Sequence, residues 1–191
     1  MTKLQNMRSH LRAGKVYRRE QLESYSSSVD RELRGLVEAG TLKKLETGLY
    51  YVPKRTAFGE APPDRKEVVK AFLKDNNFLV TSANNYNSLG VGTTQLHNST
   101  VVYNRKRHEK LKLGGNYFEF RRPAQGFPKA LSKEFLLVDL LNNLDTLPED
   151  AANVRQQVKR RLQEFDKTKL KLMVNKYGKI KTKKFFEELL K

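Results

Sequence analysis

The chain has 191 residues, of which 38 are lysine or arginine and 21 are aspartate or glutamate, so its formal net charge is +17. This excess is spread along the whole length and favours polyanions such as nucleic acid over acidic or neutral small substrates. The absence of cysteine excludes disulfides, thiol catalysis and thiolate metal sites, and it is typical of a reducing compartment.

The first elements in the chain are a helix and a short strand. Leu4, Met7 and Leu11 recur at helical spacing, and Gly14 ends that segment. Val16 and Tyr17 then form a short extended pair. A second helical stretch is expected over residues 18–25.

A helix with one buried face follows. The hydroxyls of residues 26–28 are candidate N-cap oxygens, and Val29, Leu33, Leu36 and Val37 form one apolar stripe. Gly40 is expected to end this helix. The opposite face carries Ser27, Arg31, Arg34 and Glu38, which places hydroxyls and guanidinium groups where a recognition helix enters the major groove.

Two apolar-rich runs, residues 42–46 and 49–52, are joined at Thr47–Gly48 and predict a β-hairpin with lysines on its first strand. Helix, strand, helix, helix and hairpin is the order of a winged helix-turn-helix domain, which predicts DNA binding. Arginine can pair with guanine, and lysine can neutralise phosphate. A solvated helix face and a protein-interaction module remain the alternatives. The predicted DNA-binding residues are Arg18, Arg19, Ser26, Ser27, Ser28, Arg31, Arg34, Lys43 and Lys44.

Three stretches of this segment carry a family resemblance. They are Gly14-Lys-Val-Tyr, then Val29-Asp-Arg-Glu-Leu-Arg-Gly-Leu-Val-Glu-Ala-Gly-Thr-Leu, then Glu46-Thr-Gly-Leu-Tyr-Tyr-Val. The sequence resembles the AbiEi-type antitoxins of type IV toxin-antitoxin and abortive-infection phage-defence operons. Later stretches, Thr81-Ser-Ala-Asn-Asn-Tyr-Asn-Ser-Leu-Gly-Val and Leu162-Gln-Glu-Phe-Asp-Lys-Thr-Lys-Leu, extend it. The asparagine-rich residues 84–87 and the very basic last thirty residues depart from the family pattern.

The resemblance implies a function in two parts. An N-terminal winged helix would bind an inverted repeat in operator DNA and repress the protein's own operon. A C-terminal domain would counteract a nucleotidyltransferase-like toxin, with or without a stable complex.

The remainder of the chain predicts a second domain of mixed type. Residues 1–53 form the predicted DNA-binding domain, residues 54–63 have the proline and glycine content of a linker, and residues 64–191 form the C-terminal domain. Asp64 and Glu67 resemble a capping box at the start of its first helix. The expected fold class is α+β, in which a winged helix-turn-helix precedes a mixed, mainly helical domain with a small sheet at 99–122.

Four amphipathic helices are expected over residues 132–190, where leucine, valine and aromatic residues recur at helical spacing. Two basic clusters lie outside the first domain: the first is Arg105, Lys106 and Arg107, and the second runs from Lys176 to Lys184. Both are candidate phosphate contacts, and the alternative for each is solvated surface charge.

No catalytic or metal-binding pattern is evident, and we expect neither an enzyme nor a cofactor. The sequence has three histidines and no G-x-x-x-x-G-K-[ST] loop, and the carboxylates Asp139, Asp145, Glu149 and Asp150 lack a metal-dependent spacing. Residues 1–11 lack the apolar core of a signal peptide, and no apolar run reaches the roughly 20 residues that span a bilayer. A cytoplasmic protein without membrane contact is expected.

The leading hypothesis is therefore an antitoxin that also represses its own operon. A winged-helix transcription regulator without a toxin partner, whose second domain senses a ligand or dimerises, is the first alternative. A basic RNA-binding protein is the second, because the positive charge extends over the whole chain.

Overall fold

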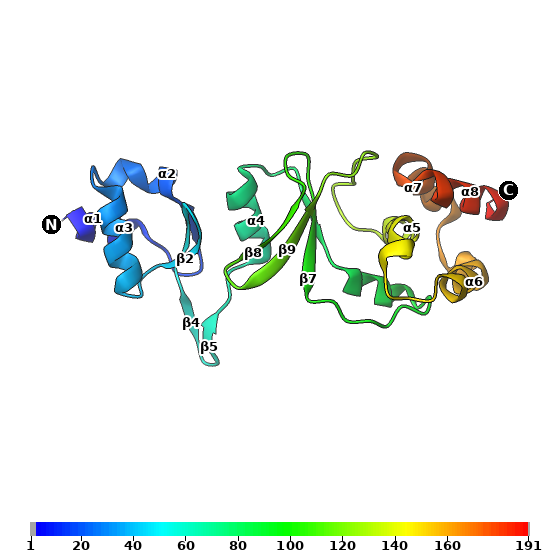
Figure 1. Ribbon diagram of the computed structural model, residues 1–191, viewed down its shortest axis with the longest axis horizontal. Coiled ribbons are helices and arrows are strands. Elements are labelled where there is room, and N and C mark those ends of the chain that lie inside the picture. Colours follow the sequence, from blue (N-terminus) through cyan, green and yellow to red (C-terminus); the bar gives the residue numbers. More distant parts are fainter. Residues whose placement is uncertain (1–2, 191) are drawn as a thin grey trace. The chain divides into compact units, whose positions relative to one another are not determined.

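The computed structural model describes residues 3–190, with the side chains described from residue 7 onward, so the predicted apolar position Leu4 lies outside the described side chains. The fold is of mixed α and β type (Figure 1). Two compact units are distinguished: the first comprises residues 1–76 and 111–116, and the second comprises residues 77–110 and 117–191.

The first unit begins with α1 (Lys3–His10), β1 (Val16–Arg18), α2 (Arg19–Leu22) and α3 (Val29–Glu38). β2 (Lys43–Glu46) and β3 (Leu49–Tyr51) follow, and the strand order of the resulting antiparallel sheet is β1-β3-β2. The predicted element order over residues 3–51 is thus confirmed, with a bulge between Lys44 and Glu46 in β2.

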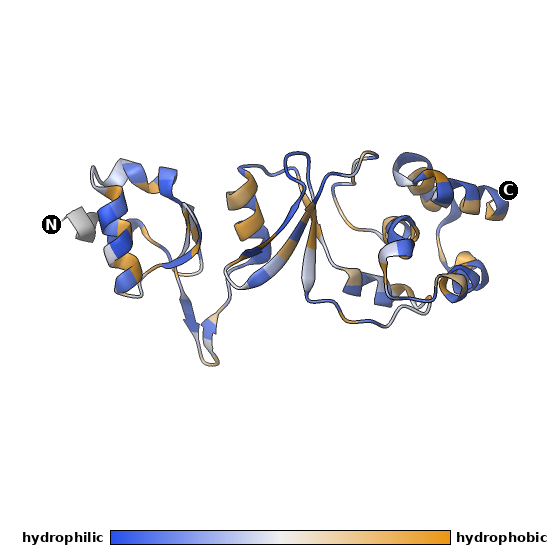
Figure 2. Cartoon of the chain, viewed as in Figure 1, coloured by the Kyte–Doolittle hydropathy of each residue, from blue (hydrophilic) through white to orange (hydrophobic). Residues whose placement is uncertain are grey.

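α3 folds as its apolar stripe predicts. Val29, Leu33 and Leu36 are buried with Met7 and Leu22 in one core cluster, whereas hydrophilic positions alternate with them along the helix (Figure 2). The helix ends in a Schellman motif. The N–H of Gly40, at φ 69°, donates to the carbonyl oxygen of Val37, and the N–H of Thr41 donates to that of Leu36.

The boundary between the units differs from the one that composition suggests. Residues 54–63, expected to be a linker, contain β4 (Lys54–Thr56) and β5 (Gly59–Ala61), which pair as an antiparallel hairpin. α4 (Arg65–Leu73), expected to open the second domain, groups with the first unit.

The contacts of α4 explain this grouping. Arg18 donates from Nη1 to the carbonyl oxygen of Ala71 at 2.6 Å, and Lys74 pairs with Glu20 at 2.7 Å. These bonds attach the C-terminal end of α4 to β1 and α2. Its N-terminus is capped as predicted, because the Asp64 side chain accepts from the N–H groups of Lys66 and Glu67.

A four-stranded sheet of order β6-β7-β9-β8 follows α4 in the chain; most of it belongs to the second unit, whereas residues 111–116 around the β8–β9 turn group with the first. It comprises β6 (Leu79–Thr81), β7 (Ser99–Tyr103), β8 (Glu109–Leu113) and β9 (Asn116–Arg121). β7 pairs antiparallel with β6 and parallel with β9. β8 and β9 are joined by Gly114 and Gly115, both at positive φ, as a tight hairpin turn requires. Between β6 and β7, the 3-10 helix η2 (Ala83–Leu89) ends at Gly90, with φ 64°.

Four helices complete the second unit: α5 (Lys133–Asn143), α6 (Ala151–Arg161), α7 (Lys167–Tyr177) and α8 (Ile180–Leu189). They confirm the four helices that apolar spacing predicts over residues 132–190. Residues 135–140 of α5 are all buried, and α5 packs against α7 and η2 in the core of this unit.

Candidate nucleic-acid interface

The exposed face of α3 carries two of the predicted base-reading residues. Arg31 and Arg34 are exposed and lie one turn apart, so their side chains leave the same side of the helix, away from its buried stripe. Ser27 is exposed just before the helix begins. Burial of the opposite face in a core fixes the direction in which both guanidinium groups extend.

The three consecutive serines do not have equivalent roles. Ser26 is buried at 9% exposure, where its Oγ donates to Glu32 Oε1 at 2.7 Å and accepts from the N–H of Ser28 at 3.0 Å. Ser28 is the N-cap residue, but its side chain makes no capping hydrogen bond. The structure thus places the Ser26 hydroxyl inside the unit, paired with Glu32, and not on the exposed surface that the prediction of a DNA contact requires.

Arg18 is also placed away from a phosphate-binding role. Its side chain is mostly buried, and its guanidinium donates to the carbonyl oxygens of Ala71 and Phe72 at the end of α4. The guanidinium group that was predicted to contact the DNA backbone thus caps the end of α4 in this structure.

Arg19 remains at the surface but is held by two carboxylates. Its Nε and Nη2 donate to the two oxygens of Asp30 at 2.6 Å, and its Nη1 pairs with Glu23. The hydrogen bond to Arg19 is the largest influence that lowers the pKa of Asp30. A phosphate at Arg19 would have to compete with these partners.

The lysines of β2 point toward solvent. Lys43 and Lys44 are exposed, and Lys43 is paired with Glu60 of β5. Lys44 is therefore the better placed of the two for a phosphate contact. Ser27, Arg31 and Arg34 are exposed predicted residues as well.

The first basic cluster of the second unit lies on an organised turn. Asn104 is 2% exposed, and its Oδ1 accepts from the N–H groups of Lys106 and Arg107 at 2.8 and 2.7 Å. This bonding holds Arg105, Lys106 and Arg107 exposed at the start of the β7–β8 connection, although Arg107 also pairs with Glu109 at 2.9 Å.

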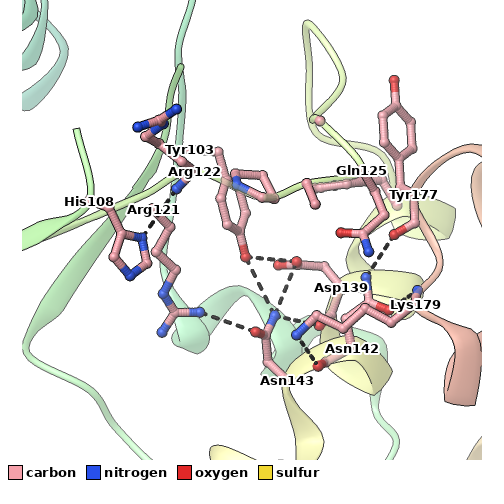
Figure 3. Close-up of a pocket in the computed structure, with 14 residues that line it drawn as sticks. Tyr103, His108, Arg121, Arg122, Gln125, Asp139, Asn142, Asn143, Tyr177 and Lys179 are labelled. Carbon is pink, nitrogen blue, oxygen red and sulfur yellow. Dashed lines mark hydrogen bonds between the residues drawn. The ribbon is translucent and has the colours of Figure 1, made fainter. Parts of the chain in front are cut away.

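Asp139, a carboxylate to which the sequence pattern assigns no role, is buried at the centre of the second unit. Asp139 accepts from the hydroxyl of Tyr103 at 2.7 Å and from Asn143 Nδ2 at 3.2 Å (Figure 3). It also accepts from the hydroxyl of Tyr86 at 2.7 Å. Burial raises the pKa of Asp139, while hydrogen bonds from Tyr103 and Tyr86 act in the opposite direction. The position of Asp139 inside the apolar run of α5 could have indicated this cluster, because a buried carboxyl group requires hydrogen-bond partners.

Next to this carboxyl is a cavity of about 310 Å³ lined by both aromatic and charged residues. Arg121 lies beside it at the end of β9 and donates to Asn143 Oδ1 at 3.2 Å (Figure 3). Arg121 also donates to Glu119 at 2.9 Å. Lys179 approaches from the residue before α8, where its Nζ donates to the carbonyl oxygen of Asn142.

Within the described residues, no group of three or more histidine, aspartate and glutamate side chains is arranged to hold a metal ion. No helix among them is long and apolar enough to cross a membrane.

No protein-family model matches the chain, and no curated protein matches it. A solved structure does resemble it: the RV2827C protein from Mycobacterium tuberculosis superposes with a TM-score of 0.60 at 14% sequence identity. The match covers 98% of this chain and 74% of that one. The likeness shows a shared mixed α and β fold.

Proposed function

We propose that the first unit is a winged helix-turn-helix domain that binds duplex DNA through α3. The observation that carries this proposal is the pair of exposed arginines, Arg31 and Arg34, on a helix whose other face is buried in the unit's core. The element order and the β1-β3-β2 sheet support it, because a helix followed by a hairpin is the arrangement that winged-helix domains present to a major groove.

Different residues serve affinity and sequence selection in this proposal. Arg31 and Arg34 read base edges in the major groove, where arginine pairs with guanine O6 and N7. Ser27 and Lys44 contact the DNA backbone, and Arg19 contributes positive charge beside the helix N-terminus. The target is an inverted repeat in the operator of the protein's own operon.

The second unit is proposed to counteract a nucleotidyltransferase-like toxin. Support for this part comes from the resemblance to AbiEi-type antitoxins over both halves of the chain. Two alternatives have their own support. The cavity beside Asp139 favours a transcription regulator that responds to a ligand, and the charge of +17 favours an RNA-binding protein.

DNA binding is tested by titrating the full chain against the duplex upstream of its gene and a scrambled duplex of equal length, over a range of salt concentrations. We expect Arg31→Ala/Arg34→Ala to lose the preference for the upstream duplex, at about 1–3 kcal/mol per base-reading arginine. The matched control is Lys66→Ala/Lys70→Ala, which removes the same charge from exposed positions one turn apart on α4.

The control variant is expected to keep the preference for the upstream duplex. Equal binding of both duplexes by the wild type, or equal losses in the two double variants, would contradict sequence recognition by α3. Tighter binding to folded RNA than to duplex DNA would instead favour the RNA-binding alternative. The antitoxin part is tested separately by growth rescue: failure of the full chain to protect cells that express the adjacent toxin gene would refute it.

A further inference from the structure

The second unit contains two neighbouring cavities that share part of their lining. The first has a volume of about 310 Å³ and lies beside Asp139. The second has a volume of about 430 Å³ and is lined in part by the first turn of α8. Gln125, Asn142 and Lys179 line both. Each volume is within the range of small-molecule sites, which run from roughly 300 to 1,000 Å³.

Cationic side chains outnumber acidic ones around these cavities. The first is lined by three such side chains, Arg121, Arg122 and Lys179, with Asp139 as its one carboxyl group. That carboxyl is 5% exposed and already accepts three hydrogen bonds, two of them from tyrosines. The polar lining therefore offers donors to a ligand.

The second cavity adds Lys181 and Arg155 to this set, opposed by Asp145, which pairs with Lys181 at 3.0 Å and with Arg155 at 3.5 Å. Lys179 is the charged residue common to both cavities. Its ammonium group donates once, to the carbonyl oxygen of Asn142 at 2.9 Å, and an ammonium group has three donors.

The N-terminus of α8 strengthens the preference for an anion. This helix has ten residues, and its N-cap residue, Lys179, makes no side-chain capping bond. Ile180, Lys181 and Thr182 of its first turn line the second cavity. Backbone N–H groups and the helix dipole at such an end favour negative charge.

Thr182 provides an independent sign of a missing partner. It is 2% exposed and lines the second cavity, and its hydroxyl oxygen has no hydrogen-bond partner. A buried hydroxyl without a partner is costly, so sites of this kind are commonly completed by a ligand or water.

We propose that these neighbouring cavities bind a small organic phosphate, with the phosphate between Lys179 and the N-terminus of α8. The lining favours an organic phosphate over the inorganic ion because Pro123, Ala124 and Phe135 contribute apolar surface to the first cavity. In Figure 3, the side chains of Lys179, Asn142 and Asn143 lie on one side of the first cavity and that of Arg121 lies on the other.

The test is calorimetric titration of the full chain with inorganic phosphate, the four nucleoside monophosphates and a set of sugar phosphates. At least one organic phosphate is expected to bind more tightly than inorganic phosphate. Lys179→Met should weaken that binding about tenfold or more, because hydrogen bonds from a charged group are lost. The controls Lys184→Met and Arg105→Gln change exposed residues that line neither cavity, and they should bind as the wild type does.

Thr182→Val separates a binding role from a structural one. This change removes the unpartnered hydroxyl and keeps the shape, so we expect an equal or higher melting temperature together with weaker phosphate binding. No binding of any phosphate at about 10 mM, a concentration that detects even weak sites, would overturn the proposal. Unchanged affinity in Lys179→Met would also overturn it, and unchanged affinity in Thr182→Val would remove the α8 terminus from the site.

A short oligoribonucleotide is the competing ligand. Binding of this oligomer that depends on Lys179, without binding of any small phosphate, would assign the surface to RNA and overturn the small-molecule proposal. The outcome is independent of operator binding, because α3 belongs to the other unit and its arginines are unchanged in these variants.

Discussion

Ser26 and Ser27 are adjacent in the chain, yet the fold gives them different environments. Ser26 is buried and bonded to Glu32, whereas Ser27 is exposed in front of α3. A run of three serines predicts a cap but cannot indicate which hydroxyl turns inward. That choice depends on Glu32, a buried acid that follows six positions later and whose Oε2 has no hydrogen-bond partner.

We expect Ser26→Ala to lower the free energy of unfolding by about 1–3 kcal/mol, because Glu32 would lose its buried hydrogen bond. The matched variant Ser27→Ala should stay within about 0.5 kcal/mol of the wild type, as surface substitutions commonly do. Urea denaturation followed by circular dichroism measures both. If the two alanine variants were equally stable, the pairing of Ser26 with Glu32 would not contribute to the fold.

At the scale of elements, Asp139 connects three segments that are distant in sequence. Tyr86 is in η2, Tyr103 ends β7, and Asp139 lies in the middle of α5. The two tyrosine hydroxyls converge on one carboxyl group, so this cluster ties the sheet and the 3-10 helix to the central helix of the second unit.

The protonation of Asp139 gives the stability of the protein a pH dependence. Burial raises the folded pKa above the ordinary value of 3.8, so the folded protein keeps a proton that the unfolded chain has released. The free energy of unfolding contributed by this group therefore falls as pH rises from near 3.8 through the raised folded pKa. We expect Asp139→Asn to remove this fall, which denaturation at a series of pH values would detect. Parallel pH profiles for wild type and variant would contradict it.

Long elements could be predicted from the sequence more fully than short ones. α3 and the four helices of the second unit follow from apolar spacing, because each turn adds a further matching residue. β6 has three residues, too few for a pattern. The β4–β5 hairpin lies in a stretch whose proline and glycine content suggests a linker. It could not be predicted from that composition, because the pairing of two strands depends on both segments together.

For the whole molecule, the two cores are the main organising feature. Leu33 lies in the core of the first unit and Leu137 in that of the second, each no more than 1% exposed. The domain boundary was hard to predict for the same reason that the candidate sites were. The boundary depends on the contact of Arg18 with α4, and the candidate cavity depends on the contact of Lys179 with α5. Both contacts join residues that are distant in the sequence and meet only in the folded chain.

Leu33→Ala and Leu137→Ala should each cost roughly 2–5 kcal/mol, as cavities in a packed core do. We expect the loss to be local to a unit. Hydrogen exchange should accelerate in α3 and β3 for Leu33→Ala, and in α5 and α7 for Leu137→Ala. Acceleration across both units in either variant would show that they unfold together.

The strand order of the second sheet has a consequence during protein synthesis. β9 lies between β7 and β8 and pairs with β7, although both neighbours precede it in the chain. When β7 leaves the ribosome, β6 can pair with it on one side, but its other edge stays open until β9 has been made. Val101 and Val102 lie in β7, so a chain that ends near residue 110 presents an apolar strand with one unpaired edge, which can pair with another chain and promote aggregation.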